Sequence, residues 1–271
     1  MTNDVGGTSE GQAAQFDTGV PHSARIWNYW LGGKDNFAAD RGVGEHVKQI
    51  FPGIVRAARA QRDFLARAVR YLAAEAQVRQ FLDVGTGLPT AENTHEVAQQ
   101  AAPESRVVYV DYDPIVLAHA RALLTSTPAG ATDYIEADLR DPGRILESAA
   151  RTLDFSQPVA LILLGILGHV SSYDEARSIV RRLTGGLTAG SYLVIADGAS
   201  VSEAGNEAQR QYNEGSSVAY YLRSPGEIAG FFAGLDLTEP GVVSCSRWRP
   251  ARTALVDADE AAVFGGVARK P

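Results

Sequence analysis

The segment 80–90 restricts the fold of this chain more than any other part of the sequence. It reads QFLDVGTGLPT, an apolar run that ends in Asp83 and passes into a turn with two glycines. A second apolar run, 106–111, ends in Asp111. In parallel α/β sheets, such a glycine turn lets the backbone approach a ligand, and a carboxylate after the next strand binds ribose. The two runs therefore predict a nucleotide-type cofactor at the carboxyl edge of a parallel sheet.

Strand-like and helix-like runs alternate through the rest of the chain. Strands are expected at 80–84, 106–111, 132–137, 158–164 and 190–196. Helices are expected at 90–101, 114–124, 142–150, 173–185 and 224–233. Alternation of this kind predicts a parallel sheet with helices on both faces. The runs 236–246 and 260–269 show no helical pattern between them, so we expect a closing antiparallel hairpin. The predicted fold is an α/β, Rossmann-like sheet of seven strands.

The first 78 residues differ in character from the alternating part. Residues 1–19 are polar with almost no apolar anchor and are expected to form a disordered leader. Residues 20–78 gather aromatic side chains around two adjacent glycines and continue into a helix at 51–76. This pattern predicts an N-terminal helical cap, and residues 79–271 are expected to form the cofactor-binding domain.

The cap has two possible roles. Its two glycines are followed by three polar residues, which contribute little to packing and favour a lid over the cofactor or substrate. In that case Tyr29, Gly33 and Asn36 are candidate cofactor contacts. The alternative is a capping helix whose Trp27 and Trp30 only pack on the core.

Composition excludes several classes of protein. A net charge of −7 and a pI near 5.3 do not favour nucleic acid as a partner. The single cysteine, Cys245, permits no internal disulfide and suits a cytoplasmic location. The five histidines show no spacing typical of metal ligands, and no run of 18 apolar residues predicts a membrane span. We therefore expect no metal and no membrane partner, while the oligomeric state stays open.

Residues at the ends of the predicted strands carry the candidate site. Asp83 is expected to order the glycine turn or to bind a cationic cofactor group. Asp111 is placed to accept ribose hydroxyls, and Asp138 to accept an adenine amino group. The apolar, glycine-spaced run around Gly165 suits a flat base or a sulfonium carbon. A dinucleotide fingerprint would place its third glycine at Thr90, so a pyrophosphate ligand is disfavoured.

The region 80–200 resembles class I S-adenosylmethionine-dependent methyltransferases, on its acidic residue and Gly-x-Gly turn, its aspartate after the second strand and its Asp-Leu after the third. The run ARIWNYWLGGKDNFAADR at 24–41 and FLDVGTGLPT at 81–90 together resemble a largely uncharacterised bacterial family of S-adenosyl methyltransferases, once listed as a domain of unknown function. This resemblance covers about residues 20–270. It implies the methyltransferase fold and S-adenosyl-L-methionine as cofactor, but it names no acceptor.

The resemblance also assigns cofactor contacts residue by residue. The methionine side would be held by Asp83, Gly85 and Gly87, the ribose by Asp111, and the adenine by Asp138 and Leu139. Thr86 and Tyr112 are further candidate cofactor contacts.

Catalytic residues are less well marked in the sequence. His169, just after the fourth expected strand, is the best-placed candidate base or acceptor-site residue. The segment after the fifth strand, with Tyr212, Asn213 and the pair Tyr220-Tyr221, is a candidate acceptor-binding region. The predicted function is methyl transfer to a small molecule. A non-catalytic S-adenosylmethionine sensor and an NAD-dependent oxidoreductase are the alternatives.

Overall fold

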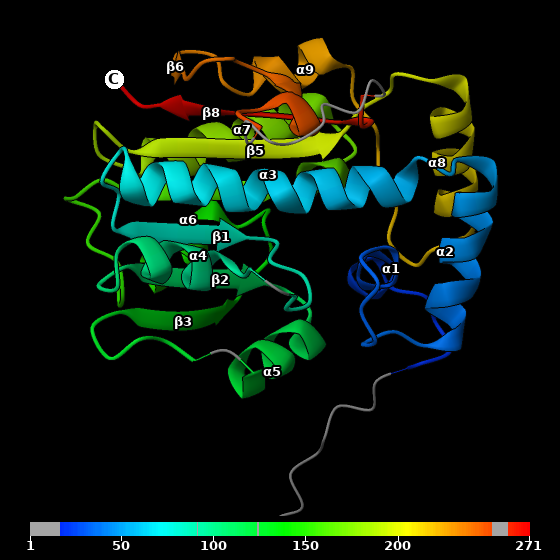
Figure 1. Cartoon of the computed structure of the whole chain (residues 1–271), viewed down its shortest axis with the longest axis horizontal. Helices are drawn as coiled ribbons and strands as arrows, with labels where there is room; N and C mark the ends of the chain where they lie inside the picture. Colours follow the sequence, from blue (N-terminus) through cyan, green and yellow to red (C-terminus); the bar gives the residue numbers. More distant parts are fainter. Residues whose placement is uncertain (1–16, 91, 124, 251–259) are drawn as a thin grey trace, which may run out of the picture.

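The computed structural model describes residues 17–90, 92–123, 125–250 and 260–271. Its strands are β1 Gln80–Val84, β2 Arg106–Asp111, β3 Ala131–Glu136, β4 Ala160–Leu164, β5 Tyr192–Gly198, β6 Asp236–Leu237, β7 Val243–Ser244 and β8 Val263–Arg269. They form one sheet in the order β3-β2-β1-β4-β5-β8-β6, and β7 also pairs with β8 (Figure 1). The first five strands pair in parallel, and β8 is antiparallel to β5. The predicted α/β, Rossmann-like fold is confirmed.

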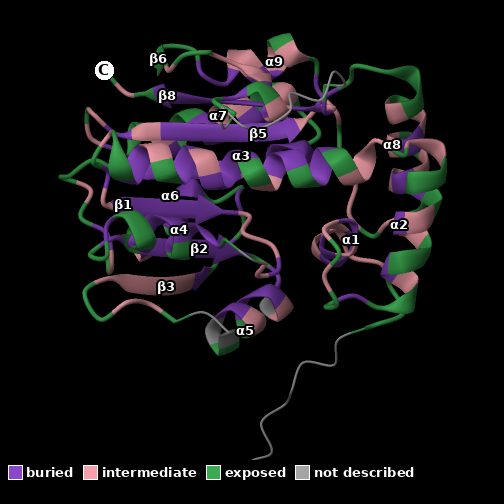
Figure 2. Cartoon of the chain, in the orientation of Figure 1, coloured by how far each residue is buried: buried purple, intermediate pink, exposed green. Residues whose placement is uncertain are grey.

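Helices cover both faces of this sheet and also extend beyond one end of it. Their bounds are α1 Ser23–Trp30, α2 Ala38–Ile50, α3 Ile54–Ala74, α4 Thr94–Ala101, α5 Pro114–Leu123, α6 Pro142–Ala149, α7 Tyr173–Gly185, α8 Glu203–Gly215 and α9 Pro225–Gly230. Buried side chains of α3 and α4 pack on one face of the sheet, and those of α6, α7 and α9 pack on the other. Figure 2 shows the central strands buried between these layers.

The closing hairpin differs from the sequence prediction. The expected strand 236–246 is two short strands, β6 and β7, which both pair antiparallel with β8. Gly241 lies between them at φ +85°, and its N–H donates to the carbonyl of Thr238 at 2.9 Å. This turn interrupts the ladder, so the sheet has eight strands in the described residues where seven were expected.

The helix expected at 90–101 begins later, at Thr94. Asn93 precedes it with extended backbone, and its N–H donates to Glu96 Oε2 at 2.8 Å. The Oδ1 atom of Asn93 also accepts the N–H of Thr90 at 3.1 Å. These bonds occupy the backbone N–H groups of Thr90 and Asn93, so the helix begins at Thr94.

A cap lies beyond the carboxyl ends of the parallel strands (Figure 1) and is formed by α1, α2 and α8. The helices of this cap are not all those of the expected cap of residues 20–78. Much of α3 packs along the sheet, and α8 comes from the chain after β5. Only Ala208 and Tyr212 of α8 are buried, so its sequence carries little apolar periodicity. Residues 1–16 of the expected leader lie outside the described residues. No helix in the described ranges is long and apolar enough to span a membrane.

Candidate functional site

A cavity of about 210 Å³ lies between the carboxyl edge of the sheet and the cap. The sheet edge contributes the ends of β1, β2, β4 and β5, and the cap contributes side chains of α1, α2 and α8. Eight of the cofactor-contact and catalytic candidates named from the sequence line this cavity. They are Asp83, Gly85, Thr86, Gly87, Asp111, Tyr112, Gly165 and His169. Folding therefore brings together the ends of strands that are far apart in the sequence.

The two glycines after β1 serve different purposes. Both have left-handed backbone, with φ +77° at Gly85 and φ +65° at Gly87. A Cβ on Gly85 would lie 2.5 Å from Cγ1 of Ile166, so the packing of the turn itself requires glycine there. A Cβ on Gly87 would meet nothing within 4 Å. Because Gly87 lines the cavity, this open space is where a ligand can approach the backbone.

Asp111 connects the first two strand ends. Its Oδ2 accepts the N–H of Gly87 at 3.0 Å, and its Oδ1 accepts the N–H of Asp113 at 3.0 Å. Each carboxylate oxygen can accept more than one hydrogen bond, so both can still receive ribose hydroxyls. Burial raises the pKa of Asp111. The neighbouring Tyr112 also lines the cavity, and its side chain is largely exposed.

Asp83 is a buried carboxylate at the end of β1. The hydroxyl of Thr94 donates to its Oδ2 at 2.6 Å. Burial raises the pKa of Asp83 to about 6, against the opposing effects of the Thr94 hydrogen bond and the charge of Arg62. A carboxylate buried at a cavity wall favours a cationic ligand group, because such a group offsets its lost hydration.

Sequence reasoning missed two polar residues of α3. Arg62 lines the cavity near Asp83, donates to Oδ1 of Asn93 at 3.3 Å, and has its pKa lowered by burial. Gln61 lines the cavity beside Gly165 and donates to the carbonyl of Ala196 at 3.1 Å. The available signal was a pair of polar residues next to the apolar stripe of a helix that packs on the sheet.

His169 lies at the end of a short 3-10 helix, Leu167–His169, that follows β4. Its Nδ1 is 2.8 Å from the carbonyl of Ala219. A carbonyl only accepts, so Nδ1 carries the proton and Nε2 is the basic nitrogen. Burial lowers the pKa of His169, which favours the neutral ring.

Tyr220 fixes the ring of His169, since the two rings meet edge to face at 5.1 Å. The Tyr220 hydroxyl donates to Asp197 and accepts the N–H of Gly198 at 3.0 Å. Asn213 brackets the Tyr220 backbone, donating to its carbonyl and accepting its N–H, each at 2.9 Å. The candidate base therefore rests on a ring that is held on several sides.

Part of the predicted acceptor region reaches the cavity and part does not. Tyr212 and Tyr220 line it, whereas Asn213 is absent from the lining and Tyr221 is exposed outside it. Asn213 holds the Tyr220 backbone and accepts a hydrogen bond from Gln209 at 3.0 Å. The segment thus supplies aromatic rings to the cavity wall.

Several other predicted contacts also lie away from the cavity lining. Asp138 accepts the N–H of Arg140 at 2.8 Å, and Leu139 is buried in the hydrophobic core. The Tyr29 hydroxyl donates to Glu45. Asn36 donates to Oδ1 of Asn28 and to the carbonyl of Gly33, each at 2.9 Å. Cofactor contacts by Asp138, Leu139, Tyr29, Gly33 and Asn36 stay predictions.

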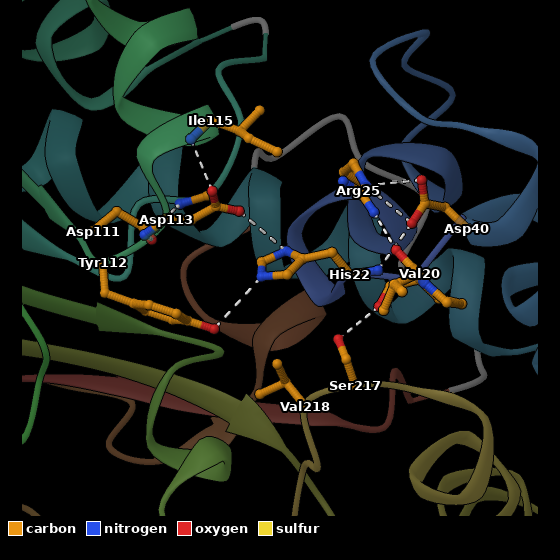
Figure 3. Close-up of polar contacts among 12 residues, drawn as sticks. Val20, His22, Arg25, Asp40, Asp111, Tyr112, Asp113, Ile115, Ser217 and Val218 are labelled. Atoms are coloured by element: carbon orange, nitrogen blue, oxygen red, sulfur yellow. Dashed lines mark hydrogen bonds and ion pairs between the residues drawn. The ribbon is translucent and has the colours of Figure 1, made fainter. Parts of the chain in front are cut away.

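His22 joins the cap to the sheet edge (Figure 3). Its Nδ1 is 3.3 Å from Oδ2 of Asp113, and its Nε2 is 3.5 Å from the Tyr112 hydroxyl. On the cap side, the backbone N–H of His22 donates to Oδ1 of Asp40 at 2.9 Å. Asp40 in turn forms a buried ion pair with Arg25 at 2.9 Å. No pattern in the sequence marks His22 as a site residue, because its partners lie in distant segments.

The sheet edge fits S-adenosyl-L-methionine, the cofactor that the sequence resemblance implies. The open space over Gly87 can admit the cofactor, and the free lone pairs of Asp111 match a ribose. Asp83 offers a buried negative charge to the cationic end of such a ligand. The residues present therefore suit this group in both shape and charge.

Comparisons with known proteins agree with this geometry. Residues 9–271 match the model of a family described as S-adenosyl methyltransferase. A DUF574 family protein from Streptomyces avermitilis is 45% identical, with a TM-score of 0.90 and coverage of 94% of this chain and 99% of that one. A presumed methyltransferase from Thermobifida fusca is 40% identical, with a TM-score of 0.86 and coverage of 94% and 96%.

A more distant structure shares the fold alone. An O-methyltransferase family protein from Burkholderia thailandensis is 16% identical, with a TM-score of 0.53 and coverage of 80% of this chain and 58% of that one. No match was found among proteins of curated function. The family model and the two close structures each extend over nearly the whole chain, so the chain belongs to the S-adenosyl methyltransferase family, whose cofactor is S-adenosyl-L-methionine.

Proposed function

We propose that this chain transfers the methyl group of S-adenosylmethionine to a small-molecule acceptor held beneath the cap. The observation that carries the proposal is a single cavity lined on one side by the Asp83, Gly87 and Asp111 edge and on the other by cap side chains. Two ligands can meet in such a space, and holding them in contact by itself favours methyl transfer. The net charge of −7 and the single thiol, which is buried, also support a cytoplasmic enzyme without a nucleic-acid partner.

The sheet edge would bind and orient the cofactor, which when bound supplies an electrophilic methyl carbon. Asp111 would accept the ribose hydroxyls while holding the backbone of Gly87 in place. Asp83 would face the cationic end of the cofactor, with Thr94 keeping its carboxylate oriented. The cap would exclude water from the space between the two ligands.

His169 would act as the general base when the acceptor carries a proton at the attacking atom. Its Nδ1–H is committed to the carbonyl of Ala219, so Nε2 takes the acceptor proton. The lowered pKa of His169 keeps this nitrogen unprotonated near neutral pH. An acceptor that attacks without losing a proton needs only the positioning.

Two measurements on the full chain test the proposal. Calorimetric titration should show binding of S-adenosylmethionine and S-adenosylhomocysteine, with NAD as the negative control. Release of S-adenosylhomocysteine should then be followed with individual phenols, alcohols and amines as acceptors. Cofactor binding without turnover of any acceptor would contradict the proposal and favour a sensor.

A further inference from the structure

We propose that the acceptor is an uncharged molecule with a flat, apolar body, an inference that rests on the proposed function. The cap wall of the cavity contains three connected rings. Trp27 meets Trp30 edge to face at 5.7 Å, and Trp30 lies 6.4 Å from Tyr212. All three residues line the cavity. Rings of this kind bind flat apolar surfaces well, by burial of area and by stacking.

Two polar atoms of the aromatic residues around the cavity are already engaged within the protein. Nε1 of Trp30 donates to the carbonyl of Gly44 at 3.1 Å. The hydroxyl of Tyr220, on the adjoining part of the wall, is shared between Asp197 and the N–H of Gly198. Trp30 and Tyr220 therefore present ring surface to the acceptor.

Charge is absent from the cap side of the cavity. Among the described residues that α1, α2 and α8 contribute to its lining, there is no Asp, Glu, Lys or Arg. His22 precedes α1 and also lines the cavity, but its ring faces Asp113 and Tyr112. The buried charges of the cap, Arg25 and Asp40, pair with each other.

A charged group of the acceptor that lay against the cap would therefore have no counter-ion there, since the charged lining residues Arg62, Asp83 and Asp111 belong to α3 and the strand ends. Desolvating an unpaired carboxylate or ammonium group is far more costly than burying a neutral ring of the same size. A cationic acceptor would also be repelled by the positive sulfonium of the cofactor, and an amine cannot attack until it is neutral. The cap wall thus selects against both signs of charge.

Three naphthalene probes with one ring system and different charge test this inference. Binding of 2-naphthol, 2-naphthoate and 2-(aminomethyl)naphthalene to the full chain is measured near pH 7.5 by fluorescence titration, with saturating S-adenosylhomocysteine. We expect 2-naphthol to bind at least ten-fold more tightly than either ion. Equal or tighter binding of an ion, or no binding of 2-naphthol, would overturn the acceptor class.

A pair of variants at Leu222, a half-buried cavity residue, checks that the probes report on this wall. Leu222→Lys should strengthen 2-naphthoate binding and weaken 2-naphthol binding, each by about ten-fold, while Leu222→Met should preserve the original preference. An unchanged preference in Leu222→Lys would refute the assignment. The affinity for S-adenosylhomocysteine is measured in the same samples. If the unmodified chain does not bind S-adenosylhomocysteine, the proposed function itself is overturned. If it binds S-adenosylhomocysteine but shows the wrong probe preference, only the acceptor class is overturned.

Discussion

Asp111→Asn should weaken cofactor binding far more than its small change in shape suggests. In the native chain both carboxylate oxygens accept a backbone N–H, one from Gly87 and one from Asp113. Bonds from ribose hydroxyls to this carboxylate are charge-assisted, worth about 1.5–3 kcal/mol each, against about 0.5–1.5 kcal/mol for neutral ones. Two such bonds lose about 2–3 kcal/mol in total, which is a loss in affinity of about 30- to 150-fold.

The same substitution should also lower stability, since the amide has one oxygen and leaves one backbone N–H facing an NH₂ group. An unsatisfied buried donor costs about 1–3 kcal/mol. Each kcal/mol lowers the melting temperature by about 2–4 °C in a domain of this size. Calorimetry with S-adenosylmethionine and thermal unfolding measure the two effects separately.

Asp133→Asn is the matched control for this substitution. Asp133 lies on the neighbouring strand β3, outside the cavity, and accepts the Tyr134 N–H at 2.8 Å and the Thr152 hydroxyl at 2.9 Å. It should lose stability in the same way and keep the native cofactor affinity. An affinity within two-fold of the native value in Asp111→Asn would refute the ribose assignment.

Three further predictions concern other parts of the site. Gly87→Ala places a methyl group in the open space of the cavity and should reduce cofactor affinity at least ten-fold by calorimetry. Gly241→Ala, at a similarly positive φ away from the cavity, should share only its backbone strain of about 1–2 kcal/mol. His169→Gln should slow turnover of a proton-bearing acceptor by about 10²- to 10⁴-fold and remove the fall in rate at low pH. Its cofactor affinity should stay within two-fold of the native value, and an equal loss of rate and affinity would make His169 structural. Folding raises the pKa of Asp83 from 3.8 to about 6, so the native chain should lose stability relative to Asp83→Asn as the pH rises from 4 to 6. Urea unfolding measures this, and a difference in unfolding free energy that does not change with pH would contradict the burial effect.

Local patterns predicted many element boundaries accurately. Asp141 caps α6 by accepting the N–H of Arg144, and Ser224 caps α9 by accepting the N–H of Glu227, both as expected from the residue types. The parallel strands were found for the same reason, since buried strands read as short apolar runs. Failures came where local signal was weak, as in α8, whose few buried positions left no clear helical period.

Some residues of the candidate site are marked by a local sequence pattern, and others are not. Asp83, Gly87 and Asp111 could be found from sequence because the chain places each directly after an apolar strand, and parallel strands end at one edge. Arg62, Gln61 and the ring of His22 could not be found in this way. Their positions depend on how α3 and the cap pack against that edge, which no local pattern records.

The sequence by itself determined the sheet, its cofactor edge and the family to which the chain belongs, because these rest on short motifs and on the periodicity of buried residues. Tertiary structure alone decided what faces that edge. The cap joins α1 and α2 to α8, a helix more than 150 residues further along the chain, and rings of α1 and α8 line the cavity. Contacts of such long range depend on shape and burial in three dimensions, so the uncharged, partly aromatic character of the cap wall became visible only in the folded chain.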